Sequence, residues 1–423
     1  MAAVTGAITP RLTLPGRFGL LHTTRLFTEP YGTAASGYTF LLLTGSEAPF
    51  DWVRLVYQNH TAAPYTIGAA SVAPSAHPPA NDTSAYRADE SAQPFTTVTF
   101  NAAGQNGLPP SPSGSTGSLV VPAVTGSAPA LVFSDWIQVS SIAPSDGGTF
   151  NYLLVRTFVS AGSPSMPIAT PNTKLTTDFP AIAGGRALRS NYAAGDITAA
   201  TGTISGVFGP AGYVTPCAVQ FYSRKRGMTV LGIGDSLEQG RYSTSDHNGA
   251  GFQAAKALST PDFPVFYANH GYSAQPSALS YAAGRAALDA YAPDVALLPV
   301  YSPNDPPDTQ AKVDASFARA LDLAHYCITR GTVPIVKTAM PWGALSGPGE
   351  ALRTSLNARA RGLSPGIMVA DYDAAVTDGA SPARLKAAFN SGDGLHLNDA
   401  GYAACAAALA PLLRRLIAAA RGG

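Results

Sequence analysis

The sequence predicts a two-part protein, with an N-terminal all-β sandwich over residues 1–226 and a C-terminal α/β domain over residues 227–423. Three observations indicate this fold class. At 423 residues the chain is longer than a single domain with one hydrophobic core usually is, so two domains are expected. A hydrophobic content of 46%, with 42 Gly and 35 Pro, is typical of a globular chain with many turns. The spacing of the apolar residues also changes near residue 226, from strand-like runs to alternating strand and helix patterns.

The N-terminal part consists of short runs rich in Val, Ile, Thr, Tyr and Phe, separated by Gly, Pro, Ser, Asn and Asp. This pattern is typical of an antiparallel sandwich, of simple or jelly-roll-like topology. The stretch 162–215 lacks such runs, and we expect it to form a long irregular connection between the two parts. The strand-like runs are 38–45, 51–59, 65–73, 95–103, 117–124, 131–142 and 149–160.

The C-terminal part alternates short apolar runs with longer segments of helical spacing. The runs are of the kind that a parallel sheet buries on both faces. In the longest helical segment Val313, Phe317, Leu321 and Ala324 recur at steps of three and four. Five repeats predict one doubly wound domain with a mainly parallel five-stranded sheet and a site at the carboxyl ends of its strands. The five runs are 228–234, 263–269, 294–300, 332–338 and 366–371.

Composition argues against several classes of partner. The net charge is +1, so no basic field favours nucleic acid or an anionic membrane. No stretch approaches the roughly 20 apolar residues of a spanning helix, and the first residues lack the apolar run of a signal peptide. The chain is therefore expected in the cytoplasm, or outside it with a leader removed. Cys217, Cys327 and Cys405 are widely spaced, and no histidine pair has ligand spacing, so we predict no metal and no cofactor.

The stretch GIGDSLEQG follows the first apolar run and admits three interpretations. A dinucleotide-binding loop needs a third glycine where Leu237 stands, and an acidic residue after the next run, where Asn269 stands. The elbow of the α/β hydrolases needs glycine where Glu238 stands. Two interpretations remain: a nucleophile, Ser236, at the carboxyl end of a strand, or simply a strand that ends in a Gly-Asp-Ser turn.

A serine nucleophile needs a base, a group that orients the base and donors for the oxyanion. Asp393 precedes His396 by three residues on one short loop. This spacing allows the carboxylate to reach Nδ1 of the imidazole and leaves Nε2 to take the serine proton. The loops after the second and third runs offer the backbone N–H of Gly271 and the side-chain amide of Asn304.

These residues fall in four separated blocks along the C-terminal part. In this order the blocks resemble those of the SGNH, or GDSL-type, hydrolase superfamily. The resemblance implies a flavodoxin-like three-layer α/β/α domain and covers that part of the chain only. The blocks are GDSL at 234–237, NHGYS at 269–273, SPND at 302–305 and DGLH at 393–396.

The same resemblance implies a role for single residues. Ser236 would be the nucleophile, His396 its general base and Asp393 the group that orients the base. The backbone N–H groups of Ser236 and Gly271, with the amide of Asn304, would form the oxyanion hole.

One block departs from the family pattern. The third block usually begins with glycine, whereas this chain has Ser302 at that position. A side chain there is expected to alter the local turn or to crowd the pocket.

The sequence thus predicts a metal-free serine esterase acting through an acyl-enzyme intermediate. The expected substrate is a small short-chain ester, with acetyl as the favoured acyl group, or an acylated carbohydrate. Tyr272, Tyr301 and Trp342, which follow the second, third and fourth runs, are candidate substrate contacts. The alternatives are a lipase or lysophospholipase, an acyltransferase with the same site, and a non-catalytic polysaccharide-binding protein that works through the sandwich.

Overall fold

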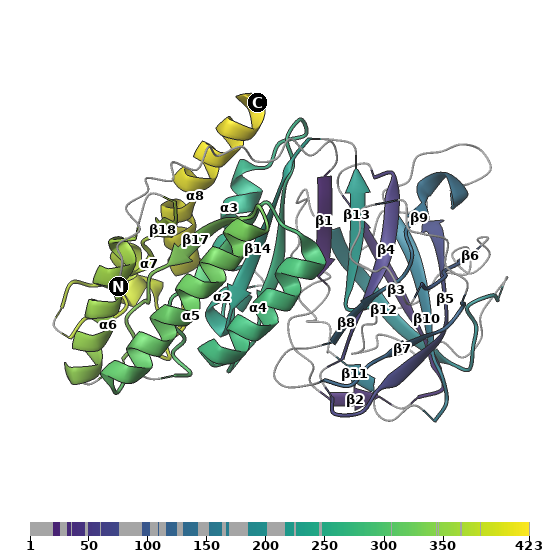
Figure 1. The fold of residues 1–423 in the computed structure, drawn as a ribbon, viewed down its shortest axis with the longest axis horizontal. Helices are drawn as coiled ribbons and strands as arrows, with labels where there is room; N and C mark the ends of the chain where they lie inside the picture. Colours follow the sequence, from purple (N-terminus) through teal and green to yellow (C-terminus); the bar gives the residue numbers. More distant parts are fainter. Residues whose placement is uncertain are drawn as a thin grey trace.

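Antiparallel strands make up the N-terminal part of the computed structural model (Figure 1). One sheet has the order β1-β13-β4-β8, with β9 paired to β4, and a second has the order β12-β3-β10-β5-β6, with β7 paired to β5. The structure describes residues 20–25, 32–34, 36–46, 50–59, 61–75, 95–101, 109, 116–124, 130–142, 152–162, 166–168, 185–200, 216–223, 226–244, 248–305, 307–343, 345, 347–363, 366–380 and 382–422. The strands are β1 (Leu20–Arg25), β2 (Gly32–Ala34), β3 (Tyr38–Ser46), β4 (Trp52–Asn59), β5 (Tyr65–Ser75), β6 (Thr96–Thr97), β7 (Leu119–Val121), β8 (Ala130–Phe133), β9 (Ile137–Gln138), β10 (Tyr152–Val159), β11 (Met166–Ile168), β12 (Gly185–Ala194) and β13 (Ala218–Ser223).

Side chains from the two sheets meet in a common core. Phe40 of the second sheet, and Leu55 and Phe221 of the first, belong to one buried cluster and are at most 2% exposed. The hydroxyl groups of Tyr57 in β4 and Thr157 in β10 lie 3.2 Å apart between the sheets. Burying one face of each sheet stabilises a sandwich, and the predicted all-β class of this part is confirmed.

The stretch 162–215 is not wholly irregular, contrary to the prediction. It contains β11, which pairs with β2, and β12, which pairs with β3 from Gly185↔Ser46 to Ala194↔Tyr38. The sequence of β12 shows no strand alternation and few β-branched residues, so only its pairing with β3 identifies it as a strand. The predicted run 131–142 is in turn divided into β8, β9 and a 3₁₀ helix, η1 (Val139–Ser141).

A five-stranded parallel sheet organises the C-terminal part, in the order β15-β14-β16-β17-β18. Two residues of β14, Leu231 and Ile233, point to the face of the sheet on which α4, α5 and α6 pack. Two others, Met228 and Val230, point to the opposite face, on which α3, α7 and α8 pack. The predicted three-layer α/β/α fold is therefore confirmed. The elements are β14 (Met228–Gly234), α2 (Ser236–Gln239), α3 (Ala250–Leu258), β15 (Val265–Gly271), α4 (Ser277–Tyr291), β16 (Val295–Pro299), α5 (Gln310–Thr329), β17 (Val333–Lys337), α6 (Gly347–Arg361), β18 (Met368–Ala370), α7 (Tyr372–Val376), η3 (Ala387–Phe389) and α8 (Asp399–Gly422).

The two parts touch where β1 of the sandwich lies beside β15, the edge strand of the parallel sheet (Figure 1). The side-chain amide of Gln220 donates to the carbonyl of Ala290 near the end of α4, at 3.1 Å. That of Gln58 donates to the hydroxyl of Tyr272 after β15, at 2.8 Å. The change from antiparallel to parallel strands falls between β13 and β14, and the division into residues 1–226 and 227–423 stays a prediction.

The last helix, α8, begins behind Asn398, whose side-chain oxygen accepts a hydrogen bond from the N–H of Gly401 at 3.0 Å. By length and apolar composition this helix could cross a membrane. Its apolar stripe nevertheless packs against the parallel sheet, as in a core helix, and every residue of the stripe is at most 1% exposed. The stripe consists of Tyr402, Cys405, Leu409, Leu413 and Leu416.

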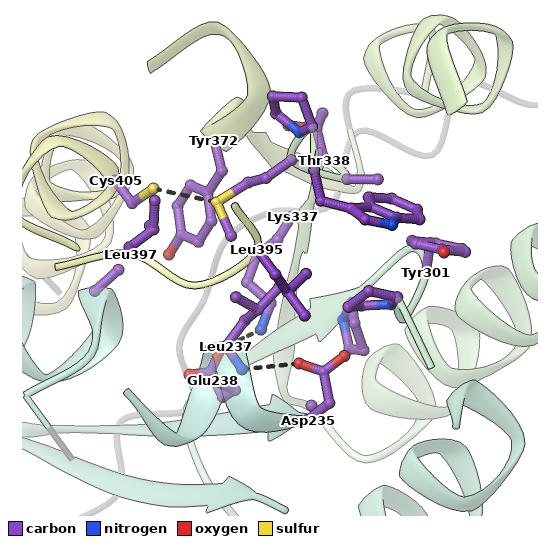
Figure 2. Close-up of a pocket in the computed structure, with 18 of the residues that line it drawn as sticks. Asp235, Leu237, Glu238, Tyr301, Lys337, Thr338, Tyr372, Leu395, Leu397 and Cys405 are labelled. Carbon is purple, nitrogen blue, oxygen red and sulfur yellow. Dashed lines mark hydrogen bonds and ion pairs between the residues drawn. The ribbon is translucent and has the colours of Figure 1, made fainter. Parts of the chain in front are cut away.

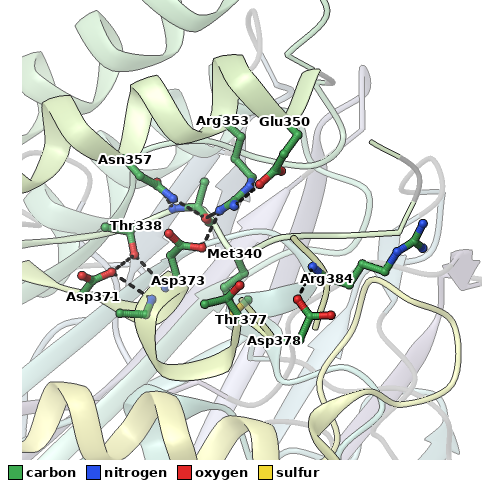
Figure 3. Close-up of polar contacts among 12 residues, drawn as sticks. Thr338, Met340, Glu350, Arg353, Asn357, Asp371, Asp373, Thr377, Asp378 and Arg384 are labelled. Carbon is green, nitrogen blue, oxygen red and sulfur yellow. Dashed lines mark hydrogen bonds and ion pairs between the residues drawn. The ribbon is translucent and has the colours of Figure 1, made fainter. Parts of the chain in front are cut away.

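A buried polar cluster ties α6 and α7 to the chain that follows β17 (Figure 3). Arg353 of α6 donates to both carboxylate oxygens of Glu350, to Asp373 of α7 and to the carbonyl of Ala339, at 2.6–2.7 Å. The side chain of Asn357 pairs with the N–H and the carbonyl of Ala339, each at 2.8 Å. These hydrogen bonds hold in place the stretch of chain that leaves β17 at Ala339 and leads to Trp342.

Candidate active site

Ser236 is the first residue of α2, on a tight turn after β14. The preceding residue, Asp235, is the N-cap, and its Oδ1 accepts from the N–H of Leu237 at 2.9 Å. The N–H of Ser236 makes no hydrogen bond within the described part of the chain. Gly234 is required for the turn, because a Cβ there would lie 2.8 Å from the Cβ of Glu238. The turn thus carries the hydroxyl and a free N–H at the carboxyl end of β14, the strand next to the edge strand β15.

A buried ion pair between Lys337 of β17 and Glu238 holds α2 against the sheet. Lys337 also donates to the carbonyl of Ile233 at 3.0 Å, and Tyr267 donates to Glu238. Both charged side chains are less than a tenth exposed. A lysine in an otherwise apolar strand run was the available sequence signal, because a charge buried there needs a partner.

The loop between η3 and α8 brings the imidazole to Ser236. Asp393 accepts from His396 Nδ1 at 2.5 Å, and from the backbone N–H groups of His396 and Leu395 at 2.8 and 2.9 Å. Since Nδ1 carries the proton of that bond, Nε2 accepts from Ser236 Oγ, 2.8 Å away. Ser236 and His396 are 5% and 8% exposed. The three side chains therefore form one hydrogen-bonded series.

Asp393 remains ionised in this series. Its partial burial favours the neutral acid, but the hydrogen bonds from the side chain and N–H of His396 and from the N–H of Leu395 hold its pKa well below the usual value. A permanent carboxylate at Nδ1 stabilises the positive charge that His396 acquires when it takes a proton.

The N–H of Gly271, which the sequence suggested as an oxyanion donor, already has an acceptor. It donates to Oδ1 of Asn269 at 2.9 Å, so this donor is already used. A Cβ at Gly271 would lie 2.8 Å from the carbonyl oxygen of Asp235 and from the carbonyl carbon of Glu238. The glycine is needed for close packing of β15 against α2, and the structure counts against a role in an oxyanion hole.

Ala274, three residues further on, has a backbone conformation that the sequence did not reveal. Its φ is +55°, in the left-handed region that residues with a Cβ rarely adopt. Its N–H makes no hydrogen bond to any described residue, while the carbonyl of Gln275 next to it contacts Asn304. Strained backbone of this kind gathers at functional sites. An alanine in YSAQP carries no sequence signal for such a conformation.

The Asn304 amide lies near two acceptors, Gln275 O at 3.2 Å and Ser302 Oγ at 3.0 Å, which are themselves 2.9 Å apart. From Nδ2 these acceptors are about 55° apart, much less than the angle of about 120° between the two N–H bonds of a planar amide. One N–H is therefore shared between both acceptors. The other N–H points away from these two acceptors.

Ser302, the departure from the family pattern, does not crowd the pocket. Its side chain is buried, and its hydroxyl donates to Oδ2 of Asp235 at 2.5 Å. Ser302 Oγ in turn accepts from the backbone N–H of Asn304 at 3.2 Å and from its side-chain amide at 3.0 Å. Burial raises the pKa of Asp235, and the hydrogen bonds from Ser302 and from the Leu237 N–H oppose that rise. Ser302 thus connects the residue before the nucleophile to the Asn304 amide.

An apolar cavity of about 50 Å³ adjoins the reacting groups (Figure 2). Residues on either side of Ser236, Asp235 and Leu237, line it, as do Leu395 and Leu397, on either side of His396. Its further lining includes Tyr301, Met340, Trp342, Tyr372, Tyr402 and Cys405.

The three predicted substrate contacts are all buried. Tyr301 and Trp342 stack with ring centroids 5.3 Å apart at 14°, and both line the cavity. Tyr272 is 5% exposed, and its hydroxyl accepts from Gln58 of the sandwich. Contact with a substrate thus stays a prediction for Tyr301 and Trp342, whereas Tyr272 lies at the interface between the two parts. An aromatic residue that the sequence analysis did not select, Tyr242, lies against the ring of His396.

No model of a protein family matches this chain, and no curated protein matches it. Among the described residues, no group of three or more His, Cys, Asp or Glu side chains is placed to hold a metal ion.

Solved structures of GDSL-type proteins resemble the C-terminal part. A member of the lipolytic protein G-D-S-L family from Veillonella parvula is 16% identical, with a TM-score of 0.34, over 44% of this chain and 99% of that one. A family 3 carbohydrate esterase from Clostridium thermocellum is 14% identical, with a TM-score of 0.34, over 46% and 100%. Esterase EstA from Pseudoalteromonas is 15% identical, with a TM-score of 0.35, over 45% and 98%. The GDSL/SGNH resemblance predicted from the four sequence blocks is thus found again among solved structures, for the C-terminal part of the chain.

Proposed function

We propose that this protein is a serine esterase that hydrolyses short-chain carboxylic esters through an acyl-enzyme intermediate. The observation that carries the proposal is the hydrogen-bonded series from Ser236 Oγ through His396 to Asp393. A hydroxyl is a weak nucleophile, and a neutral imidazole 2.8 Å away supplies the base that it needs.

In the first half of the reaction, Ser236 Oγ attacks the ester carbonyl carbon while its proton passes to His396 Nε2. The tetrahedral intermediate collapses as Nε2 returns that proton to the leaving alkoxide, which departs as the alcohol. In the second half, water gives a proton to Nε2 and attacks the acyl carbon. The proton returns to Ser236 Oγ as the acid leaves, so both serine and imidazole are restored.

The oxyanion formed in each half needs donors placed before the reaction begins. We assign the N–H of Ser236, the N–H of Ala274 and the unshared N–H of the Asn304 amide. Two observations support the set: the first two N–H groups make no hydrogen bond within the described residues, and the Asn304 amide is held beside Gln275. Gly271 is left out because its N–H is bonded to Asn269.

The cavity beside Ser236 favours a short acyl group. Its volume of about 50 Å³ corresponds to the space of roughly three to five water molecules, since each needs roughly 10–15 Å³. An acetyl or propionyl chain fits such a space, whereas an octanoyl chain exceeds it. This size disfavours the lipase and lysophospholipase alternatives. Transfer of the acyl group to a second alcohol instead of water uses the same residues and stays an alternative.

The test compares p-nitrophenyl acetate with p-nitrophenyl octanoate, using the full chain, Ser236→Ala and Asn304→Ala. Ser236→Ala should abolish hydrolysis with an unchanged circular dichroism spectrum, whereas Ser355→Ala, an exposed serine on α6, is the matched control. Asn304→Ala should lower kcat about 10²–10³-fold, the usual effect of removing one oxyanion donor. Turnover by Ser236→Ala would refute the proposal, and faster turnover of octanoate would refute the short-chain specificity.

The non-catalytic alternative, a polysaccharide-binding sandwich, needs an exposed platform of aromatic rings. Trp136 does not provide it, because the ring is 6% exposed and the Arg54 guanidinium lies 4.5 Å above it. If wild-type protein hydrolysed no ester but bound polysaccharide, this alternative would replace the esterase proposal.

A further inference from the structure

Tyr242 is unusual in two independent respects. Its side chain is 53% exposed, one of the few large hydrophobic side chains in the described residues to be so open. Its φ is +65°, in the left-handed region that tyrosine rarely adopts, because the Cβ approaches the carbonyl oxygen. Neither property contributes to a core, so both need a reason outside folding.

The surrounding structure holds the strained turn from both sides. The N–H of Arg241 donates to the carbonyl of Ser236 at 3.1 Å, and the carbonyl of Arg241 accepts from the hydroxyl of Tyr402 at 2.9 Å. On the other side, the N–H and hydroxyl of Ser243 donate to the carbonyl of Gly240 at 3.2 and 2.6 Å. Tyr242 therefore has a fixed position relative to Ser236.

That position is against the base. The ring of Tyr242 lies 5.0 Å from the ring of His396, tilted by 45°. His396 returns its proton to the leaving alkoxide, so the alcohol part of an ester must pass beside this imidazole. In the proposed reaction the acyl part enters the cavity lined by Leu237 and Leu395, and Tyr242 does not line that cavity. The exposed ring is accordingly on the side of the alcohol.

We propose that Tyr242 is the platform on which the alcohol part of the substrate lies, and that this alcohol is a sugar ring; the inference rests on the proposed esterase function. An open aromatic face binds the apolar C–H face of a pyranose, and a neighbouring group must satisfy the hydroxyls at its edge. The Arg241 guanidinium, which is exposed and lies over the Tyr242 ring with its carbon 5.4 Å from the ring centroid, has five N–H donors that can meet this need. Its bond to Ser273 Oγ uses one of them and fixes the group in place.

The buried aromatic residues do not offer such a surface. Trp342, the predicted sugar contact, is 8% exposed and stacked on Tyr301. Among the described residues that contact the hydrogen-bonded series, Tyr242 has the exposed aromatic ring.

The first experiment measures acetate release from methyl 2,3,4-tri-O-acetyl-xyloside, phenyl acetate and ethyl acetate. Tyr242→Gly removes the ring and is free to keep the left-handed backbone, and Tyr242→Phe keeps the ring. Relative to ethyl acetate, kcat/KM for the sugar ester should fall about tenfold in Tyr242→Gly, mainly through KM, and should change less than about twofold in Tyr242→Phe. Ile328→Ala, at an exposed apolar residue on α5, is the matched control and should keep the wild-type ratio. An unchanged ratio in Tyr242→Gly, or a loss for phenyl acetate only, would overturn the assignment.

A second experiment separates this inference from the esterase proposal, because it requires no turnover. Calorimetric titration of Ser236→Ala with the same acetylated xyloside should show binding that weakens about tenfold in Ser236→Ala/Tyr242→Gly. The two proteins should have equal melting temperatures, or the double variant the higher one, since glycine relieves the strained φ. Equal affinity of the two proteins, or no binding by Ser236→Ala, would overturn the platform even if wild-type protein hydrolyses simple esters.

Discussion

Replacing Ser302 with alanine removes one hydroxyl from the centre of the site and provides a quantitative test of the arrangement. Ser302 Oγ is the partner of Asp235 Oδ2 at 2.5 Å, and Oδ1 is bonded to the Leu237 N–H. Above the pKa of Asp235 the variant leaves a buried carboxylate oxygen without its donor. A hydrogen bond to a charged group contributes about 1.5–3 kcal/mol, so we expect a loss of about 2 kcal/mol in the free energy of unfolding.

The loss should depend on pH in a defined direction. Burial raises the pKa of Asp235 and the Ser302 hydrogen bond opposes that rise, so Ser302→Ala raises this pKa further. A raised carboxyl pKa stabilises the fold below the unfolded value of about 4 and loses that stabilisation as pH rises. The free energy of unfolding that Ser302→Ala loses relative to the wild type should therefore be larger at pH 8 than at pH 4. At pH 4 a larger share of the Asp235 carboxyl is protonated, and a hydrogen bond between neutral groups contributes only about 1 kcal/mol, so the loss should be smaller than at pH 8.

Scanning calorimetry of the full chain at pH 4 and pH 8 provides the measurement. For a part of about 200 residues, 2 kcal/mol corresponds to a decrease of roughly 4–8 °C in Tm. Ser302→Thr keeps the hydroxyl and should remain close to the wild type. Ser302→Ala should also lower kcat, and this decrease should disappear when Asn304 is already alanine, since Ser302 acts on the reaction through that amide. An equal change in Tm at both pH values, or a kcat decrease that persists with Asn304→Ala, would refute the reasoning.

Three further predictions concern residues around the site. Gly271→Ala should lower Tm and kcat together, because the added Cβ meets the backbone of α2 beside Asp235; such overpacking destabilises by about 1–3 kcal/mol, and a neutral result in calorimetry would contradict the close approach. In urea unfolding, Lys337→Met should lose about 3–5 kcal/mol of stability, because it leaves the charge of Glu238 buried without its partner. The double variant Lys337→Met/Glu238→Gln should recover much of this loss, and no recovery would show that the ion pair is not the cause. The pKa of Asp393 is held below its usual value, so the stability that this carboxylate contributes is present above about pH 4 and is lost as pH falls. Asp393→Asn should therefore lower Tm more at pH 7 than at pH 3, and a larger decrease at pH 3 would refute this direction.

The sequence by itself determined the fold class of both parts. Residues 228–234 form a strand because they are a continuous apolar run, and such a run requires a sheet that is covered on both faces. The contact between Asp393 and His396 could also be predicted from the sequence, because side chains three residues apart on a short loop stay close together. The contact of His396 with Ser236 was expected from the resemblance of the four blocks to the SGNH pattern, since the loop that carries His396 lies between η3 and α8 and follows no strand of the parallel sheet.

Only the tertiary structure decided which donors and which surfaces belong to the site. The sequence selected Gly271 for its residue type, but Asn269 accepts from its N–H, and we therefore propose the N–H of Ala274 in its place. Likewise β12 is a strand because β3 pairs with it, and nothing in its own residues indicates this. Tyr242 has its exposed, left-handed position because Ser236 and Tyr402, which are distant in sequence from each other, hold its neighbour Arg241. Local spacing records short-range geometry, whereas the partner of an N–H group and the exposure of a ring depend on chain segments that meet only on folding.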